Sequence, residues 1–252
     1  MSRRLPGCIV LGLLSVNSQA ALFDRGNGMI YDNVLDVTWL QDANYANTSG
    51  YVTAGGRAVS ANAGRMTWDE ATTWAAQLNY GGFNDWRLPG VKPINGVNFQ
   101  IAVSFNGSTD FGEHITSPQS EMSYMYYVNL QNASVHDTSG RYIGCGSTGA
   151  CLQNTGLFQN FLPDNYWTGT SRDATFAWSF NAQHGIQTPF DGKANLFHAW
   201  ALRSGDVAAV PLPGAFGLLC SALMALRRLR ASQGESYICS SKQGGFGCAA
   251  NS

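Results

Sequence analysis

The chain has 252 residues, with 15 Lys and Arg, 16 Asp and Glu, and only 12% charged residues. Without the two apolar ends considered below, residues 21–213 keep nine basic and 15 acidic residues, a net charge of about −6. An acidic body without a basic stripe excludes nucleic acids and other polyanions as partners. A composition rich in Gly, Asn, Ser and Tyr is typical of a loop-rich extracellular domain.

The first 20 residues have the layout of a secretory signal peptide. Arg3 and Arg4 precede an apolar stretch over residues 8–16, and small and polar residues follow up to Ala20. This order predicts export and cleavage near Ala20 or Ala21. The apolar stretch is too short for a stable membrane span. The body that remains, residues 21–206, has the size of a single domain.

Residues 22–42 alternate between apolar and polar positions and predict a β-hairpin. Its strands would be residues 29–31 and 37–40, joined by a turn. The Gly-, Ala- and Ser-rich residues 43–66 indicate an exposed excursion. Four acidic and amide residues of the hairpin lack the ligand spacing and the distal Glu of a calcium loop, which favours turn chemistry for Asp24, Asn27, Asp32 and Asp36.

The clearest helix signal begins at Thr67. Thr67 and Glu70 are spaced as a capping box, and apolar residues recur at helical spacing from Ala71 to Leu78, which predicts one buried face. A Tyr-Gly-Gly sequence then ends the pattern. A second helix is predicted over residues 120–130, where a stripe of Met and Tyr is typical of a core.

Three segments in the last third of the body alternate again and predict three strands of one antiparallel sheet. They are residues 166–170, 176–180 and 199–203. Together with the two helices they predict an α+β fold, in which a small antiparallel sheet carries two helices and long loops.

Residues 83–89, Phe-Asn-Asp-Trp-Arg-Leu-Pro, place aromatic, charged and turn residues too close together for an ordinary strand. Arg87 in this segment has two interpretations. It could bind an acidic ligand, or it could be a partly buried arginine paired with a carboxylate such as Glu70 or Asp85. The second interpretation is favoured because both neighbours of Arg87 are apolar.

Cys145 and Cys151 are the two cysteines of the body, and they flank a short stretch of small residues. An oxidising exterior would favour a disulfide between them. A redox pair or half of a metal site is the alternative, but the Cys-x-x-Cys spacing and a second ligand cluster are absent from the sequence. We therefore expect a structural disulfide, and neither a metal nor a cofactor.

The C-terminal segment combines a proline-rich turn, an apolar run and a basic cluster. Residues 208–226 carry no charge and would form a helix about 28 Å long, close to the roughly 30 Å hydrocarbon core of a membrane. The basic cluster would then lie in the cytoplasm. A buried amphipathic helix is the alternative, disfavoured because no polar face interrupts the run. The turn and cluster residues are Val210, Pro211, Leu212, Pro213, Arg227, Arg228 and Arg230.

This tail over residues 207–230 resembles the PEP-CTERM sorting signal, with Val-Pro-Leu-Pro in place of the usual Val-Pro-Glu-Pro. The resemblance implies processing by an exosortase-type enzyme, and a location at the envelope, outer surface or extracellular matrix of a bacterium. Members of that family normally end just after the basic cluster. Here residues 231–252 follow, a Gly-, Ser- and Cys-rich extension that we expect to be disordered.

Five motifs follow one another along residues 22–206 and resemble the Lcl C-terminal domain family, a group of bacterial extracellular domains. They are residues 22–42, 67–71, 85–89, 166–170 and 200–203. Most members have no assigned activity. The adhesin that gives the family its name binds sulfated glycosaminoglycans, but the acidic body here does not suit a polysulfate. The motif residues are Thr67, Trp68, Glu70, Asp85, Trp86, Arg87, Leu88, Pro89, Tyr166, Trp167, Trp200 and Arg203.

The first helix, the Gly-Gly turn and the Trp-rich strands also look like a C-type-lectin-like arrangement. The Glu-Pro-Asn or Gln-Pro-Asp motif that binds calcium and sugar in true C-type lectins is absent from the sequence.

Three function classes follow from the sequence. A surface or matrix module that binds an extracellular polysaccharide or a surface protein is favoured, because Tyr, Trp and Asn suit contacts to sugars. A purely structural envelope protein is the second class. An enzyme is least favoured, because the four histidines show no metal-ligand spacing and the sequence contains neither a nucleophile elbow nor an evident acid pair.

Overall fold

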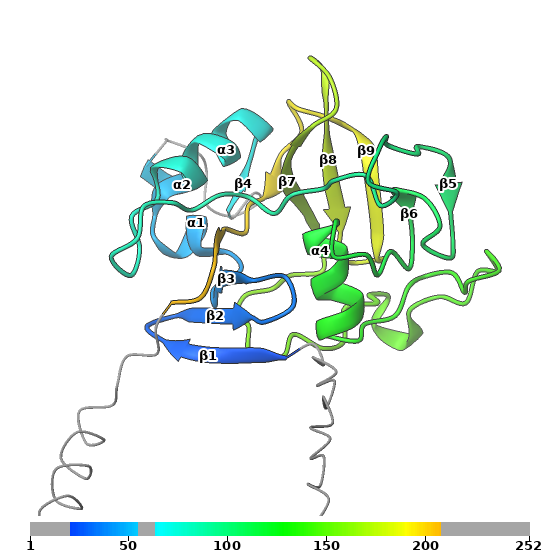
Figure 1. The fold of residues 1–252 in the computed structure, drawn as a ribbon, viewed down its shortest axis with the longest axis horizontal. Coiled ribbons are helices and arrows are strands. Elements are labelled where there is room, and N and C mark those ends of the chain that lie inside the picture. The colour runs from blue at the N-terminus through cyan, green and yellow to red at the C-terminus, as the bar shows by residue number, and fades with distance from the viewer. Residues whose placement is uncertain (1–20, 55–63, 208–252) are drawn as a thin grey trace, which may run out of the picture. The chain divides into compact units, whose positions relative to one another are not determined.

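A computed structural model describes residues 21–54 and 64–207, which contain two β-sheets (Figure 1). The first sheet has four antiparallel strands in the order β1-β2-β3-β11. Its strands are Leu22–Gly26, Met29–Asp32, Val37–Leu40 and Leu202–Ser204. The first three therefore form the predicted hairpin with one additional strand, and the last returns from the far end of the domain.

The second sheet has seven strands in the order β4-β10-β7-β8-β9-β6-β5. The central strands β7, β8 and β9 are antiparallel, whereas β10 joins β7, and β5 joins β6, in parallel. The strands are β4 Arg65–Met66, β5 Val103–Ser104, β6 Phe111–Gly112, β7 Asn165–Ser171, β8 Phe176–Asn181, β9 Ile186–Gly192 and β10 Phe197–His198.

The single antiparallel sheet expected from the sequence is therefore corrected to two sheets, within an α+β fold. The predicted third strand, residues 199–203, pairs in part with β3 of the first sheet through β11, and the strand beside β8 is instead β9. The described residues of the 43–66 segment, 43–54 and 64–66, also differ from the exposed excursion that was expected. Ala43, Ala46 and Val52 of this segment are buried in the core. The likeness to C-type lectins stays a prediction.

The two predicted helices are present. The first is α3, Trp68–Gln77, and it has a complete capping box: Thr67 Oγ1 accepts from the backbone N–H of Glu70, while Glu70 Oε2 accepts from that of Thr67 at 2.8 Å. The second begins as α4, Glu121–Tyr124, and continues as a π-helical turn, Met125–Asn129. Two further short helices, α1 and α2, are Tyr45–Thr48 and Tyr51–Ala54.

At the turn before β3, Asp32 has the local structural role that turn chemistry predicts. Asp32 is fully buried, and its Oδ1 accepts hydrogen bonds from the backbone N–H groups of Val34 at 2.9 Å and Leu35 at 3.0 Å. Burial raises the pKa of this carboxyl group. Among the described residues, no three His, Cys, Asp or Glu side chains are placed to hold a metal ion.

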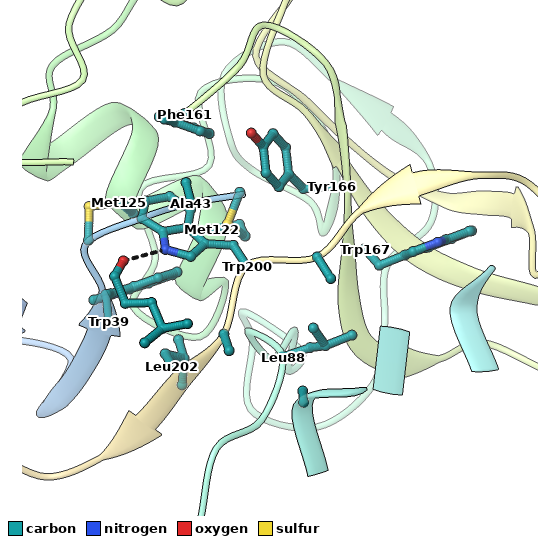
Figure 2. Close-up of a cluster of buried hydrophobic side chains, with 14 of the residues drawn as sticks. Trp39, Ala43, Leu88, Met122, Met125, Phe161, Tyr166, Trp167, Trp200 and Leu202 are labelled. Atoms are coloured by element: carbon teal, nitrogen blue, oxygen red, sulfur yellow. Dashed lines mark hydrogen bonds between the residues drawn. The ribbon is translucent and has the colours of Figure 1, made fainter. Parts of the chain in front are cut away.

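A cluster of aromatic side chains fills the space between the two sheets (Figure 2). Trp200, which lies two residues before β11, is fully buried, and its ring centre lies 4.7 Å from those of Trp39 and Phe158 and 4.9 Å from that of Phe161. Its indole N–H donates to the carbonyl of Leu40 at 2.7 Å. This one side chain thus contacts both the hairpin and the loop before β7.

Residues 1–20 and 208–252 lie outside the described part of the chain. The predicted signal peptide, the sorting residues between Val210 and Arg230, and the extension over residues 231–252 therefore stay predictions. Within residues 21–54 and 64–207, no helix combines the length and the apolar character that a membrane crossing requires.

A half-buried cluster of polar side chains joins β4 and β10 to the loop before β7. Arg65 donates through Nε to Asp164 Oδ2 at 3.0 Å, and His198 Nε2 lies 3.3 Å from the same oxygen. Burial acts to raise the pKa of Asp164, but hydrogen bonds from His198, the backbone of Asn165 and Arg65 outweigh it and lower that pKa to about 2.

The lowered pKa of Asp164 predicts a loss of stability in acid. Its ordinary pKa is 3.8, so its contribution is complete above that value and is lost as the pH falls through about 2. The difference corresponds to about 2 kcal/mol of unfolding free energy. Urea unfolding between about pH 5 and pH 2 should therefore show a steeper decline for the parent chain than for Asp164→Asn. Equal declines in unfolding free energy for the two proteins would contradict the lowered pKa of Asp164.

Candidate functional site

The segment over residues 85–91 crosses between the two sheets and presents alternate side chains to the core and to solvent. Trp86 and Leu88 are buried, and the indole N–H of Trp86 lies within hydrogen-bond distance of the carbonyls of Tyr80 and Phe83. Arg87 between them points outward and keeps its side chain 40% exposed. The segment is therefore anchored by its apolar residues and displays its charged ones.

Arg87 forms a two-pronged ion pair with Glu121 at the start of α4. Nη1 donates to Oε2 at 2.7 Å and Nη2 to Oε1 at 2.8 Å. The same carboxylate also accepts from the backbone N–H of Gly90. The prediction that Arg87 pairs with a carboxylate is confirmed, but the proposed partners, Glu70 and Asp85, were wrong.

Those two carboxylates are occupied elsewhere. Glu70 closes the capping box of α3, and Asp85 accepts from Arg203 Nε and Nη2 at 2.8 and 2.9 Å. These bonds lower the pKa of Asp85. The guanidinium of Arg203 also lies 4.1 Å from the ring centre of Phe83. The 85–89 segment is thus linked to α4 and to β11 by two separate ion pairs.

The remaining motif residues lie in the core or along its margin. Tyr166 and Trp167 of β7 are fully buried. The indole N–H of Trp167 donates to the carbonyl of Met66 at 2.9 Å, and that of Trp68 donates to the carbonyl of Thr168 at 2.8 Å. These side chains fasten β4 and α3 to β7, so their part in the motif is structural.

A groove of about 500 Å³ opens on the solvent side of this framework. Thr72 and Ala76 of α3 form one wall, and β7 and β11 contribute Thr170 and Ser204. Apart from Gly169 of β7, the other lining residues belong to two segments, 86–92 and 118–121, and include Arg87, Lys92, Gln119 and Glu121, the first residue of α4.

Hydrogen bonds to the backbone fix the shape of this groove. Thr170 Oγ1 accepts from the N–H of Val91 at 2.9 Å and donates to its carbonyl at 3.0 Å. The N–H of Lys92 donates to the carbonyl of Gln119 at 2.8 Å. The two loops are therefore bound to each other and to β7. The groove presents hydroxyl, amide, guanidinium and ammonium groups beside apolar surface, and a few such polar groups in a partly apolar site are what orients a bound ligand.

Part of this groove escaped sequence reasoning. Lys92, Gln119, Thr170 and Ser204 come from four separate parts of the chain, and no single motif contains them. Thr170 ends the 166–170 motif, whereas the other three lie outside the motifs. Glu121 looked like an ordinary residue in the first turn of a helix. Only the meeting of the two loops with β7 brings these residues together.

The predicted disulfide is confirmed. Cys145 and Cys151 are bonded, with their Cα atoms 4.5 Å apart, and they enclose a short 3₁₀ turn, Gly146–Thr148. Cys151 is buried, and its backbone N–H donates to the carbonyl of Gln183 at 2.7 Å, beside the turn between β8 and β9. The disulfide fastens this loop to the second sheet and does not line the groove.

Removing the guanidinium of Arg87 should destabilise the domain, because Glu121 would keep its charge with only 15% of its side chain exposed. We expect Arg87→Ala to lower the free energy of unfolding by about 1–3 kcal/mol. Chemical denaturation measures this, and a double-mutant cycle with Glu121→Gln isolates the pair. As a control, Arg141→Ala at an exposed arginine should change stability by less than about 0.5 kcal/mol. An Arg87→Ala variant with an unchanged free energy of unfolding would contradict the structural role of Arg87.

Comparison with known proteins gives one match. The model of the family described as the Lcl C-terminal domain matches residues 28–203. This range includes the hairpin, α3, the 85–89 segment, β7 and most of β11. No curated protein and no solved structure matches.

Proposed function

Since the chain belongs to the Lcl C-terminal domain family, we propose that it is an exported bacterial binding module that holds a glycan in the groove beside Arg87. The observation that carries the proposal is the lining of this groove. Gln119 and Ser204 are exposed, Thr72 is half-buried, and all three present groups that can pair with sugar hydroxyls.

Electrostatics supports a glycan of low charge. Arg87 and Lys92 bring two positive charges to the groove and Glu121 brings one negative charge. Because Arg87 and Glu121 already neutralise each other, a bound ligand meets neutral donors and acceptors and the single ammonium group of exposed Lys92. The acidic body disfavours a polysulfate. The proposed role is binding without catalysis, and a purely structural envelope role is its alternative. The proposed likeness to C-type lectins agrees with sugar binding on loops beside a sheet.

The test is a binding screen of neutral and acidic polysaccharides with the purified protein, with and without calcium. Once a ligand is found, Gln119→Ala should weaken its binding about ten-fold, because an exposed amide in the groove is lost without disturbing the core. Gln77→Ala, on the exposed end of α3 but outside the groove lining, is the matched control. Equal binding by both variants would place the ligand elsewhere, and a screen without any ligand would favour the structural role.

We also propose that the C-terminal tail sorts the protein by an exosortase-type system and holds it at the membrane until it is processed. The last residues of the described domain are fixed to it, because Asp206 accepts two hydrogen bonds from Arg25 of β1, at 2.8 and 2.6 Å. The disulfide between Cys145 and Cys151 suits an oxidising compartment outside the cytoplasm.

A reporter fused after Asp206 should accordingly lie outside the cytoplasmic membrane. If the tail is processed, this reporter should also separate from an epitope placed after Arg230. Protease accessibility of intact cells and immunoblotting measure the two outcomes. The same fusion without residues 1–20 serves as the cytoplasmic control. Finding the full-length fusion in the cytoplasm would exclude export.

A further inference from the structure

Arg87 uses only one edge of its guanidinium to bind Glu121. A guanidinium is planar and has five N–H donors. Nη1 and Nη2 donate to the two oxygens of Glu121 at 2.7 and 2.8 Å, and Nη1 also donates to the carbonyl of Leu88 at 3.1 Å. Two donors remain, the N–H of Nε and the second N–H of Nη2, and no acceptor among the described residues takes either of them. We call these two donors the open edge of Arg87.

Two other arginines of the chain show what this edge binds. Arg25 donates through Nε and Nη2 to the two carboxylate oxygens of Asp206, at 2.8 and 2.6 Å. Arg203 donates through the same two atoms to the two oxygens of Asp85, at 2.8 and 2.9 Å. Parallel N–H groups of this kind match the two oxygens of a carboxylate. The open edge of Arg87 therefore has the geometry of a carboxylate-binding site.

A ligand in the groove can reach the open edge. Arg87 lines the groove, and its side chain is 40% exposed. Solvent reaches Nε, because this atom makes no hydrogen bond within the described chain and yet is not one of its buried atoms without a partner. Glu121 holds the guanidinium by its Nη1 and Nη2 end. A ligand carboxylate would thus meet donors already fixed in place, which lowers the entropic cost of binding.

Lys92 adds a positive charge to the same groove. It is exposed, and the ion pairs formed between described residues do not include it. Its backbone is fixed, because the N–H of Lys92 donates to the carbonyl of Gln119 at 2.8 Å and the N–H of Glu121 donates to that of Gly90 at 3.1 Å. The ammonium group therefore extends from a segment that is bound to the one carrying Glu121, and it attracts a negatively charged ligand group.

The balance of charge limits how acidic this ligand is. Arg87 and Lys92 bring two positive charges to the groove and Glu121 brings one negative charge, which leaves one positive charge in excess. The body as a whole has a net charge of about −6 and repels a densely charged polyanion. One carboxylate in the groove neutralises the excess charge, and further carboxylates would meet the acidic surface.

We propose that the groove selects a glycan with isolated uronic acid residues, whose carboxylate binds the open edge of Arg87 while Lys92 supplies the second positive charge. This inference rests on the proposed glycan binding and names the residues that set its specificity. Neutral sugars on either side of the uronic acid would pair with Gln119 and Ser204, which line the same groove. The single carboxylate then decides which glycan is retained.

Polysaccharides that differ only in the carboxylate test this selection. The acidic probes are hyaluronan and deacylated gellan, in which each repeating unit has a single glucuronate. The matched probes are the same polymers after chemical reduction of every carboxylate to a primary alcohol. Biolayer interferometry measures their binding to the purified full-length protein in mild detergent. We expect the acidic form of a bound polymer to have an affinity about ten-fold higher than that of its reduced form.

Variants assign the preference for the acidic form to the two cations. Lys92→Met removes the exposed ammonium group and should lower the preference about three-fold. Arg87→Lys keeps a positive charge beside Glu121 but lacks the open edge, so it should remove most of the preference. Arg141→Met is the matched control, because it removes one positive charge from an exposed position outside the groove lining. Thermal melting verifies folding, and Lys92→Met decides alone if Arg87→Lys does not fold.

The outcomes that overturn this inference are distinct from those that overturn the proposed function. If both forms bind equally and Gln119→Ala weakens both, the groove binds glycans but does not select a carboxylate. If the preference persists in Lys92→Met and in folded Arg87→Lys, the carboxylate is bound elsewhere. If only neutral glycans bind the protein, glycan binding stands and the inference is wrong. If no glycan binds at all, the proposed function fails and the inference fails with it.

Discussion

The hydrogen bond from the indole of Trp200 to the carbonyl of Leu40 ties the segment before β11 to β3, and the 85–91 segment that borders the groove is in turn paired with β11. Trp200 stands just before β11, at the point where the chain passes from the second sheet to the first. Because its ring is fully buried among Trp39, Phe158 and Phe161, its position is fixed from both sides. An indole buried in this way contributes both a large apolar surface and a satisfied polar group.

The geometry of the groove depends on this contact. β11 begins two residues after Trp200, and Leu202 exchanges two backbone hydrogen bonds with Arg87, at 2.8 and 2.9 Å. The 85–91 segment is thereby laid along β11 with Arg87 directed outward. Glu121 then fixes the guanidinium and, through the N–H of Gly90, the start of the next loop. A change in the core would consequently reach the groove through this backbone pairing and through Trp86 and Leu88, which belong to both the core and the lining.

Local signals in the sequence were sufficient for the hairpin, for α3 with its capping box and for the disulfide, because each depends on residues close together in the chain. β9 was missed for a physical reason. It contains Pro189 and the fully buried Gln187, so it lacks the alternation of a typical strand. Gln187 is tolerated because its amide donates to the carbonyl of Asp110 at 2.8 Å and accepts from Ser123.

Contacts between residues far apart in the sequence limited what could be predicted about the site. Arg87 and Glu121 are separated by 34 positions, and the sequence offered nearer carboxylates of equal chemical merit. The choice was made by α3, which uses Glu70 for its own cap, and by Arg203, which engages Asp85. The capping box of Glu70 was readable from the local pattern, whereas the pairing of Arg203 with Asp85 left no local signal. That Arg87 pairs with a carboxylate was therefore predictable, whereas the identity of that carboxylate depended on the assembled fold.

Most motif residues belong to the framework rather than to the groove: Trp86, Trp167 and Trp200 fill the core. This explains why family membership predicts the fold better than it predicts the ligand. Lys92 and Gln119, which could contact a ligand directly, lie outside the motifs on loops that backbone bonds hold in place. Substitution there alters the chemistry of the groove without cost to the core. A shared framework can therefore present different lining residues, and ligand preference can diverge among domains that fold alike.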